Sequence, residues 1–118
     1  MTPKPETNST LSLDALQGQV ERWITEIGGG YYSILTNALL LMEEVGELAR
    51  LLARHYGDQS FKPGEDSSPQ ALADEFADIL FVLACLANQT GVDLAQAFQE
   101  KLARKNVRLR PKPAGNSS

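Results

Sequence analysis

Apolar residues recur along most of this chain at the three- and four-residue spacing of an α-helix. The pattern predicts four helices, over residues 13 to about 27, 33–56, 69 to about 90 and 94 to about 108. No segment has the two-residue period of a β-strand, so we expect an all-α fold, a four-helix bundle with two long central helices. Turn and cap residues mark the boundaries: Gly28, Gly57 and Gly91 follow helices, and Ser12, Ser68 and Asp93 precede them.

The length of 118 residues is that of one domain. We expect it to cover residues 12–109, between disordered tails at 1–11 and 110–118 that are rich in proline, serine and asparagine. The formal net charge of −4 argues against a nucleic-acid polymer as partner. We expect no membrane attachment, because the longest apolar run, residues 79–87, is too short to cross a bilayer. The N-terminus lacks the pattern of a signal peptide, and the single Cys85 fits a buried, reduced thiol, so we expect a cytoplasmic protein.

Two groups of acidic residues interrupt the apolar stripes of the second and third predicted helices: Glu43, Glu44 and Glu47, then Glu75 and Asp78. Residues three or four apart share a helix face, so antiparallel packing of the two helices would bring both groups into one pocket. Converging carboxylates repel one another unless a cation neutralises them. Oxygen ligands without His or Cys suit Mg²⁺ first and Mn²⁺ second, and the chemistry that fits is hydrolysis of a phosphoanhydride.

The acidic groups allow two other interpretations, a solvated helix face and a di-iron centre. Glu-Glu-x-x-Glu is common on solvated helix faces, and alone it would be weak evidence for a metal. A di-iron centre of the ferritin type requires Glu-x-x-His pairs, and His55, the only histidine, does not lie three residues after a glutamate. The repetition of the acidic spacing in two successive leucine-rich helices favours the hard-ion site.

Residues 43–47 (Glu-Glu-Val-Gly-Glu) and 75–78 (Glu-Phe-Ala-Asp) together match the Glu-Glu-x-x-Glu … Glu-x-x-Asp signature of a known family. In these motifs, and from about Leu13 to Arg108, the chain resembles the MazG-type nucleotide pyrophosphohydrolases. It is most similar to their short single-domain bacterial branch, which includes the YpjD proteins.

The resemblance implies an all-α, Mg²⁺-dependent enzyme that splits nucleoside triphosphates into monophosphate and pyrophosphate. It implies Glu44, Glu47, Glu75 and Asp78 as metal ligands. Glu43 would lie behind them or help to orient the attacking water.

The resemblance also implies assembly into homodimers, or tetramers built from dimers, with active sites near subunit contacts. Such contacts would cover the run 79–87, which is too apolar for a solvated helix face. Related enzymes place a lysine and, four or five residues later, an asparagine near the nucleotide. Lys101 and Asn106 have this spacing here, and Lys105 is a competing candidate.

Tyr31 and Tyr32 follow a triple glycine and are the aromatic residues that we favour for contact with the base, although such residues are more often core. We therefore expect a homo-oligomeric nucleoside triphosphate pyrophosphohydrolase that clears surplus or aberrant nucleotides. The alternatives are a phosphoribosyl-ATP pyrophosphohydrolase-like enzyme and a catalytically inactive dimeric interaction module.

Overall fold

The computed structural model describes residues 10–57 and 60–108. Within them the chain has four helices and no strand: α1 (Leu13–Glu26), α2 (Ile34–Tyr56), α3 (Pro69–Thr90) and α4 (Leu94–Arg108). The four predicted helices are confirmed, each to within one residue at its ends. Apart from residues 10 and 11, the predicted tails lie outside the described residues.

Each helix begins where a short polar side chain caps its first turn. The hydroxyl oxygens of Ser12, Ser33 and Ser68 accept hydrogen bonds from the backbone N–H three residues further on, at 3.0, 3.1 and 3.2 Å. Asp93 caps α4 in the same way, at 3.0 Å. One such cap stabilises a helix by about 1 kcal/mol. Ser12, Ser68 and Asp93 are the predicted caps, whereas Ser33 precedes its helix rather than beginning it.

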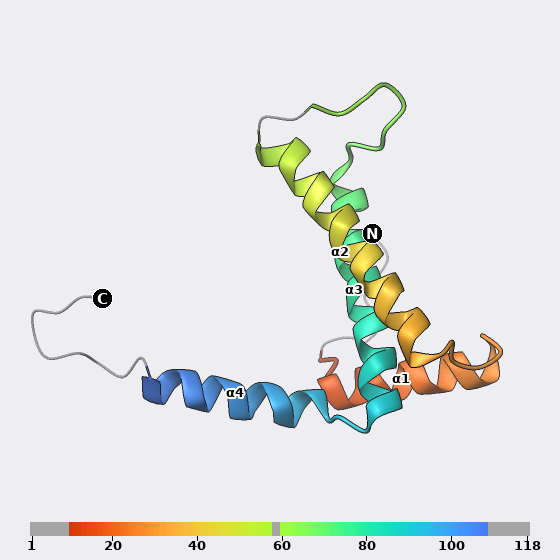
Figure 1. Cartoon of the computed structure of the whole chain (residues 1–118), viewed down its shortest axis with the longest axis vertical. Helices are drawn as coiled ribbons and strands as arrows, with labels where there is room; N and C mark the ends of the chain where they lie inside the picture. The colour runs from red at the N-terminus through yellow and green to blue at the C-terminus, as the bar shows by residue number, and fades with distance from the viewer. Residues whose placement is uncertain (1–9, 58–59, 109–118) are drawn as a thin grey trace, which may run out of the picture.

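The helices α2 and α3 run antiparallel, side by side, as a long hairpin (Figure 1). The helix α1 crosses α3 near the base of this hairpin. After Gly91, whose φ of 74° lies in the left-handed region that favours glycine, the chain turns into α4, which extends away from the hairpin (Figure 1). The hairpin brings the acidic segments of α2 and α3 opposite one another.

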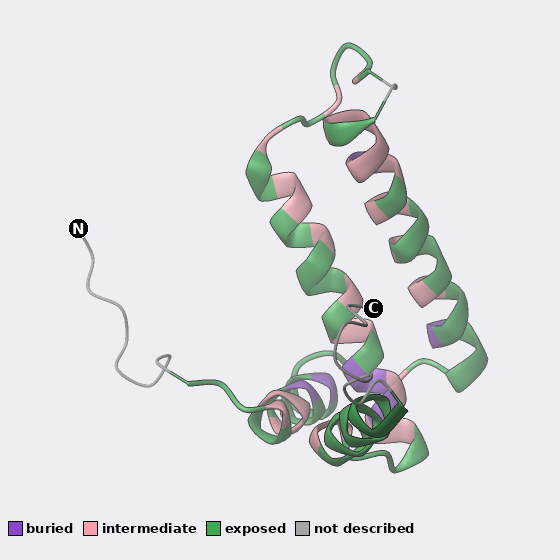
Figure 2. Cartoon of the chain, turned by 90° about the vertical axis from the view of Figure 1, so that its left-hand side faces the viewer, coloured by how far each residue is buried: buried purple, intermediate pink, exposed green. Residues whose placement is uncertain are grey.

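The buried core lies at the crossing of α1 and α3, at the base of the hairpin (Figure 2). Val20 and Ile24 from α1 pack there against Ala84 and Cys85 from α3. Cys85 is a free cysteine with 3% of its surface exposed, so the predicted burial of this thiol is confirmed. Partly buried apolar side chains surround the cluster: Leu16, Tyr31 and Phe81.

Within one chain, the four helices do not close around a common core. Leu35, Leu39 and Met42 lie along α2 with 77%, 65% and 69% of their surface exposed. These positions follow helical spacing, so they form one apolar stripe on the outer face of α2. None of the described helices is both long enough and apolar enough to pass through a lipid bilayer.

The apolar run 79–87 on α3 contains both buried and exposed side chains. Ala84 and Cys85 are buried against α1, and Ala87 is buried as well, but Leu80 and Leu83 are 40% and 39% exposed. The run is thus buried within the chain only in part. Its remaining apolar surface, like the α2 stripe, is accessible in a single copy.

Candidate active site

Three carboxylates meet between α2 and α3. One oxygen each from Glu44, Glu75 and Asp78 lies within 4.8 Å of the other two. Glu44 comes from the middle of α2, and Glu75 and Asp78 share one face of α3 because they are three residues apart. The structure thus brings together three of the four predicted metal ligands.

In this cluster the pKa values of Glu75 and Asp78 are raised. The pKa of Glu75 rises from 4.5 to about 7, mainly through hydrogen bonding with the Glu44 carboxyl group, then through burial and the negative charges of Glu44, Asp78 and Glu47. Burial, followed by the charge of Glu44, raises the pKa of Asp78. The cluster therefore lacks the positive charge that would let all its members ionise at neutral pH.

The donor set fits a divalent cation. Among the described residues, no partner donates a hydrogen bond to the buried Oε2 atom of Glu75. An oxygen atom in that position is satisfied by a cation, and carboxylate oxygens are the ligands preferred by Mg²⁺ and Mn²⁺. The residues present therefore suit the hard ion that the sequence predicts.

Glu47 and Glu43, the other two predicted acidic residues, lie outside this group of three. The Glu47 carboxylate is paired with the guanidinium of Arg50, one turn further along α2. Glu47 nevertheless lies near the cluster, because its charge contributes to the raised pKa of Glu75. Glu43 is exposed on α2. Both residues remain predictions as functional groups.

Arg50 is a residue of the site that the sequence analysis missed. Its guanidinium joins Glu47 to Glu65 of the α2–α3 connection, with 2.7 Å between Arg50 Nη1 and Glu65 Oε2. The only sequence signal was its position one turn after Glu47, and nothing in the pattern indicated Glu65. A cavity of about 320 Å³ lies beside this pair, lined by Glu47, Arg50, Leu51, Phe61, Glu65, Asp66, Ala71 and Glu75.

A second cavity, of about 370 Å³, lies on the other side of the cluster, toward α1. Leu40 and Val82 line it, each four residues from a cluster member, Glu44 and Asp78. Part of the cavity wall therefore lies about one helical turn along α2 and α3 from the residues that carry the carboxylates. Its other walls are mostly aromatic, apolar and glycine residues: Trp23, Ile24, Gly28, Gly29, Gly30, Tyr31, Tyr32, Asn37, Phe81 and Cys85.

The two predicted tyrosines both line the second cavity but differ in their surroundings. The Tyr31 hydroxyl donates to Glu21 and accepts a hydrogen bond from Asn88 Nδ2 at 3.0 Å. Burial, followed by the hydrogen bond with Glu21, raises the pKa of Tyr31 to about 12. Tyr32 is 65% exposed, and its backbone carbonyl accepts a hydrogen bond from Gln89 at 2.7 Å. Tyr31 is thus tied into the fold, whereas the Tyr32 ring is accessible.

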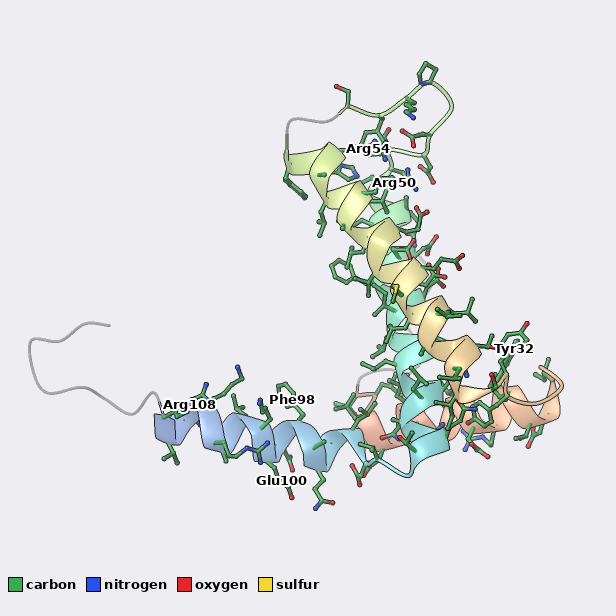
Figure 3. The ribbon with its side chains drawn as sticks, viewed as in Figure 1. Tyr32, Arg50, Arg54, Phe98, Glu100 and Arg108 are labelled. Atoms are coloured by element: carbon green, nitrogen blue, oxygen red, sulfur yellow. The ribbon has the colours of Figure 1, made fainter. Side chains whose placement is uncertain are left out.

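Lys101, Lys105 and Asn106 are exposed on α4. Figure 3 labels Phe98 and Arg108 on this helix, which points away from the part of the hairpin where Arg50 lies. The described chain therefore does not bring the predicted lysines and asparagine to its own carboxylate cluster.

Comparisons of the sequence and of the structure with known proteins identify the same family. The model of the MazG nucleotide pyrophosphohydrolase domain matches residues 32–112. The uncharacterized protein YpjD of Bacillus subtilis (strain 168) is 36% identical over 100 residues, which are 85% of this chain and 88% of that protein.

Two crystal structures share the fold. YPJD from Bacillus subtilis superposes with a TM-score of 0.73 at 36% identity, covering 83% of this chain and 98% of that one. A Bacillus-conserved MazG protein, a nucleotide pyrophosphohydrolase, gives a TM-score of 0.71 at 30% identity, covering 88% and 97%. The family model spans more than half of the chain and includes the whole carboxylate cluster. The chain therefore belongs to the MazG nucleotide pyrophosphohydrolase family and is a hydrolase of pyrophosphate bonds.

Proposed function

We propose that the chain is a Mg²⁺-dependent nucleoside triphosphate pyrophosphohydrolase that converts an NTP or dNTP into the monophosphate and pyrophosphate. The observation that carries this proposal is the convergence of Glu44, Glu75 and Asp78, from two helices, with their oxygens within 4.8 Å of one another. We further propose a cytoplasmic role in clearing surplus or aberrant nucleotides, and Mn²⁺ as a substitute ion.

In this proposal, Glu44, Glu75 and Asp78 hold the ion, and Glu47 joins them from the next turn of α2. A bound Mg²⁺ would supply positive charge at the phosphates and would activate a water for attack on phosphorus. Glu43, one residue before a proposed ligand, would help to orient the attacking water. The raised pKa of Glu75 supports this assignment, because a bound cation would offset the repulsion between the carboxylates and stabilise their ionised forms at neutral pH.

The cavity toward α1 is the proposed site of the nucleobase. It offers aromatic side chains on which a base can stack, and it begins one turn from the metal ligands, as a nucleotide with phosphates at the ion requires. Asn37, 4% exposed, is held in its wall by a 2.8 Å hydrogen bond to Gln89. Tyr32 supplies an exposed ring at the edge of this cavity, whereas Tyr31 shapes its wall.

The exposed apolar stripes of α2 and α3 support self-association as a homodimer or as a tetramer of two dimers. Leu35, Leu39 and Met42 leave more apolar surface in water than a stable single chain usually does. In such an assembly, Lys101, Lys105 and Asn106 would contact the nucleotide bound by another copy, since α4 extends away from its own hairpin.

The test is incubation of the purified chain with a panel of NTPs, dNTPs and phosphoribosyl-ATP in Mg²⁺, with measurement of released pyrophosphate. We expect pyrophosphate from at least one NTP or dNTP, and none in EDTA. Release from phosphoribosyl-ATP alone would identify a phosphoribosyl-ATP pyrophosphohydrolase-like enzyme instead. A chain that binds the ion but turns over no member of the panel would refute the proposed activity.

A further inference from the structure

Arg50 connects a residue of the acidic motif to the segment between α2 and α3. Its guanidinium donates from Nη2 to Glu47 and from Nη1 to Glu65, the latter at 2.7 Å. The three side chains are 39%, 46% and 24% exposed, in the order Arg50, Glu47, Glu65. Figure 3 shows Arg50 and Arg54 at the end of the hairpin where this segment begins.

Glu65 makes most of the hydrogen bonds and ion pairs within residues 60–66 of that segment, whose described part is residues 60–68. Glu65 Oε1 accepts a 2.6 Å hydrogen bond from the backbone N–H of Lys62, which is the main cause of the lowered pKa of Glu65. The backbone N–H of Glu65 in turn donates to the Lys62 carbonyl at 3.0 Å. Arg54 holds the same segment from α2, through 3.2 Å to the Ser60 carbonyl and 3.5 Å to Glu65. The position of residues 60–66 therefore depends on what Glu65 binds.

Glu47 has two possible partners. It lines the same cavity as Glu75, so a cation held by the cluster would attract it. The structure pairs it with Arg50. Exposed ion pairs of this kind are weak, so the pairing can be exchanged for a divalent cation.

We propose that Arg50 is a positioning residue that couples the carboxylate cluster to residues 60–66. When Glu47 turns to a cation at Glu44, Glu75 and Asp78, the Arg50 guanidinium is released from Glu47 and held by Glu65 alone. A planar guanidinium with several donors can pass from a shared to a bidentate arrangement in this way. The inference rests on the metal site of the proposed function, but not on catalysis.

The coupling has consequences that simple charge effects do not share. Removing a positive charge near a cation site raises cation affinity whatever the geometry, and removing a negative charge lowers it. If Glu65 acts through Arg50, however, its effect on cation affinity must disappear when Arg50 is absent. Residues 60–66 must also become more ordered when a cation binds, and only in chains that contain Arg50.

The test uses Mn²⁺ alone, without nucleotide, on the full chain. Free Mn²⁺ measured by electron paramagnetic resonance gives the affinity, and hydrogen exchange of residues 60–66 gives their order. We expect Arg50→Gln to tighten Mn²⁺ binding about two- to fivefold and Glu65→Gln to weaken it by a similar factor. This is the change in affinity expected from one exposed ion pair. Adding Glu65→Gln to Arg50→Gln should change the affinity by less than about 1.5-fold.

Hydrogen exchange supplies the second readout. In the wild-type chain, Mn²⁺ should slow exchange of residues 60–66, and in Arg50→Gln it should not. Arg50→Lys keeps the charge but cannot bridge two carboxylates, so Mn²⁺ affinity should stay within about twofold of wild type while the slowing is lost.

Arg54→Gln is the matched control, because Arg54 holds the same segment without contacting Glu47. It should speed exchange of residues 60–66 and leave Mn²⁺ affinity unchanged. Additive effects of Arg50→Gln and Glu65→Gln, or exchange that does not respond to Mn²⁺ in the wild type, would overturn the coupling. A chain that shows the whole pattern but hydrolyses no nucleotide would overturn only the proposed activity.

Discussion

The carboxyl groups of Glu44 and Glu75 meet across the α2–α3 hairpin, and hydrogen bonding between them is the largest cause of the raised pKa of Glu75, about 7. Two acidic groups on different helices therefore share one site. In the ion-free chain, this arrangement opposes the packing of α2 against α3 whenever both groups are ionised. A property that lowers the stability of the empty hairpin is the same property that attracts a divalent ion.

The stability of the ion-free chain should therefore depend on pH through Glu75. The pKa of Glu75 is about 7 in the folded chain and 4.5 in the unfolded chain. Between these pH values the folded state therefore holds a proton that the unfolded state has lost. The free energy of unfolding must then fall as pH rises from about 4.5 to about 7, by an amount on the order of 1–2 kcal/mol after solvent screening. Urea unfolding in EDTA at pH 5 and pH 8 measures this change.

Glu75→Gln provides the comparison for that measurement. The variant has no carboxyl group to titrate, so its unfolding free energy should change less between pH 5 and pH 8 than that of the wild type. It should also be the more stable chain at pH 8 in EDTA, and Mg²⁺ should stabilise the wild type far more than the variant. Identical pH dependence in the two chains would show that Glu75 does not titrate in this range.

Asp78 tests the cluster by activity. Asp78→Asn removes the charge of one proposed ligand with almost no change in shape, so the helix should remain intact. Mutation of a residue that only hydrogen-bonds to a metal ligand typically lowers metal affinity or activity about 10–100-fold. Loss of a ligand itself should therefore lower turnover about a hundredfold or more. Pyrophosphate release at saturating Mg²⁺ measures it. Asp74→Asn, which changes an exposed residue bonded to Gln70 on the same helix, is the matched control and should retain activity.

The fold and the cluster could be predicted from sequence because both depend on local spacing. Glu44 lies on the inner face of one helix, and Glu75 and Asp78 lie three residues apart on the next. A hairpin of two successive long helices leaves few ways to arrange them. Caps such as Ser12 and Ser68 are likewise set by the neighbouring residues alone.

What could not be predicted depends on contacts between distant residues. Glu47 faces Arg50 rather than the three converging oxygens, and that choice depends on Glu65 in an irregular segment with no periodicity to read. The Tyr31 hydroxyl bonds to Asn88, 57 residues away, so no local pattern could show that Tyr31 is held within the fold.

The two tyrosines should therefore respond differently to substitution. Tyr31→Phe removes hydrogen bonds to Glu21 and Asn88, so it should lower the free energy of unfolding by about 1 kcal/mol and leave KM nearly unchanged. Tyr32→Ala removes an exposed ring at the edge of the proposed base cavity, so it should raise KM about three- to tenfold while stability changes little. Thermal unfolding and initial rates on the best substrate distinguish the two. An unchanged KM in Tyr32→Ala would remove this residue from the base contacts.

Leu39 tests whether the apolar stripe of α2 is an interface between copies of the chain. Its side chain is 65% exposed between Leu35 and Met42, so a partner helix would bury it and a glutamate there would place a charge in the interface. Leu39→Glu should shift the mass measured by light scattering to that of one chain, 12.9 kDa. It should also lower activity, because residues of α4 would no longer reach a neighbouring site.

Leu11→Glu, at an exposed leucine before α1, should leave the mass unchanged. A wild type with the mass of one chain would contradict the proposed self-association. If Leu39→Glu keeps a larger mass, the proposed interface is on another surface, and the exposed face of Leu80 and Leu83 on α3 is the next to change.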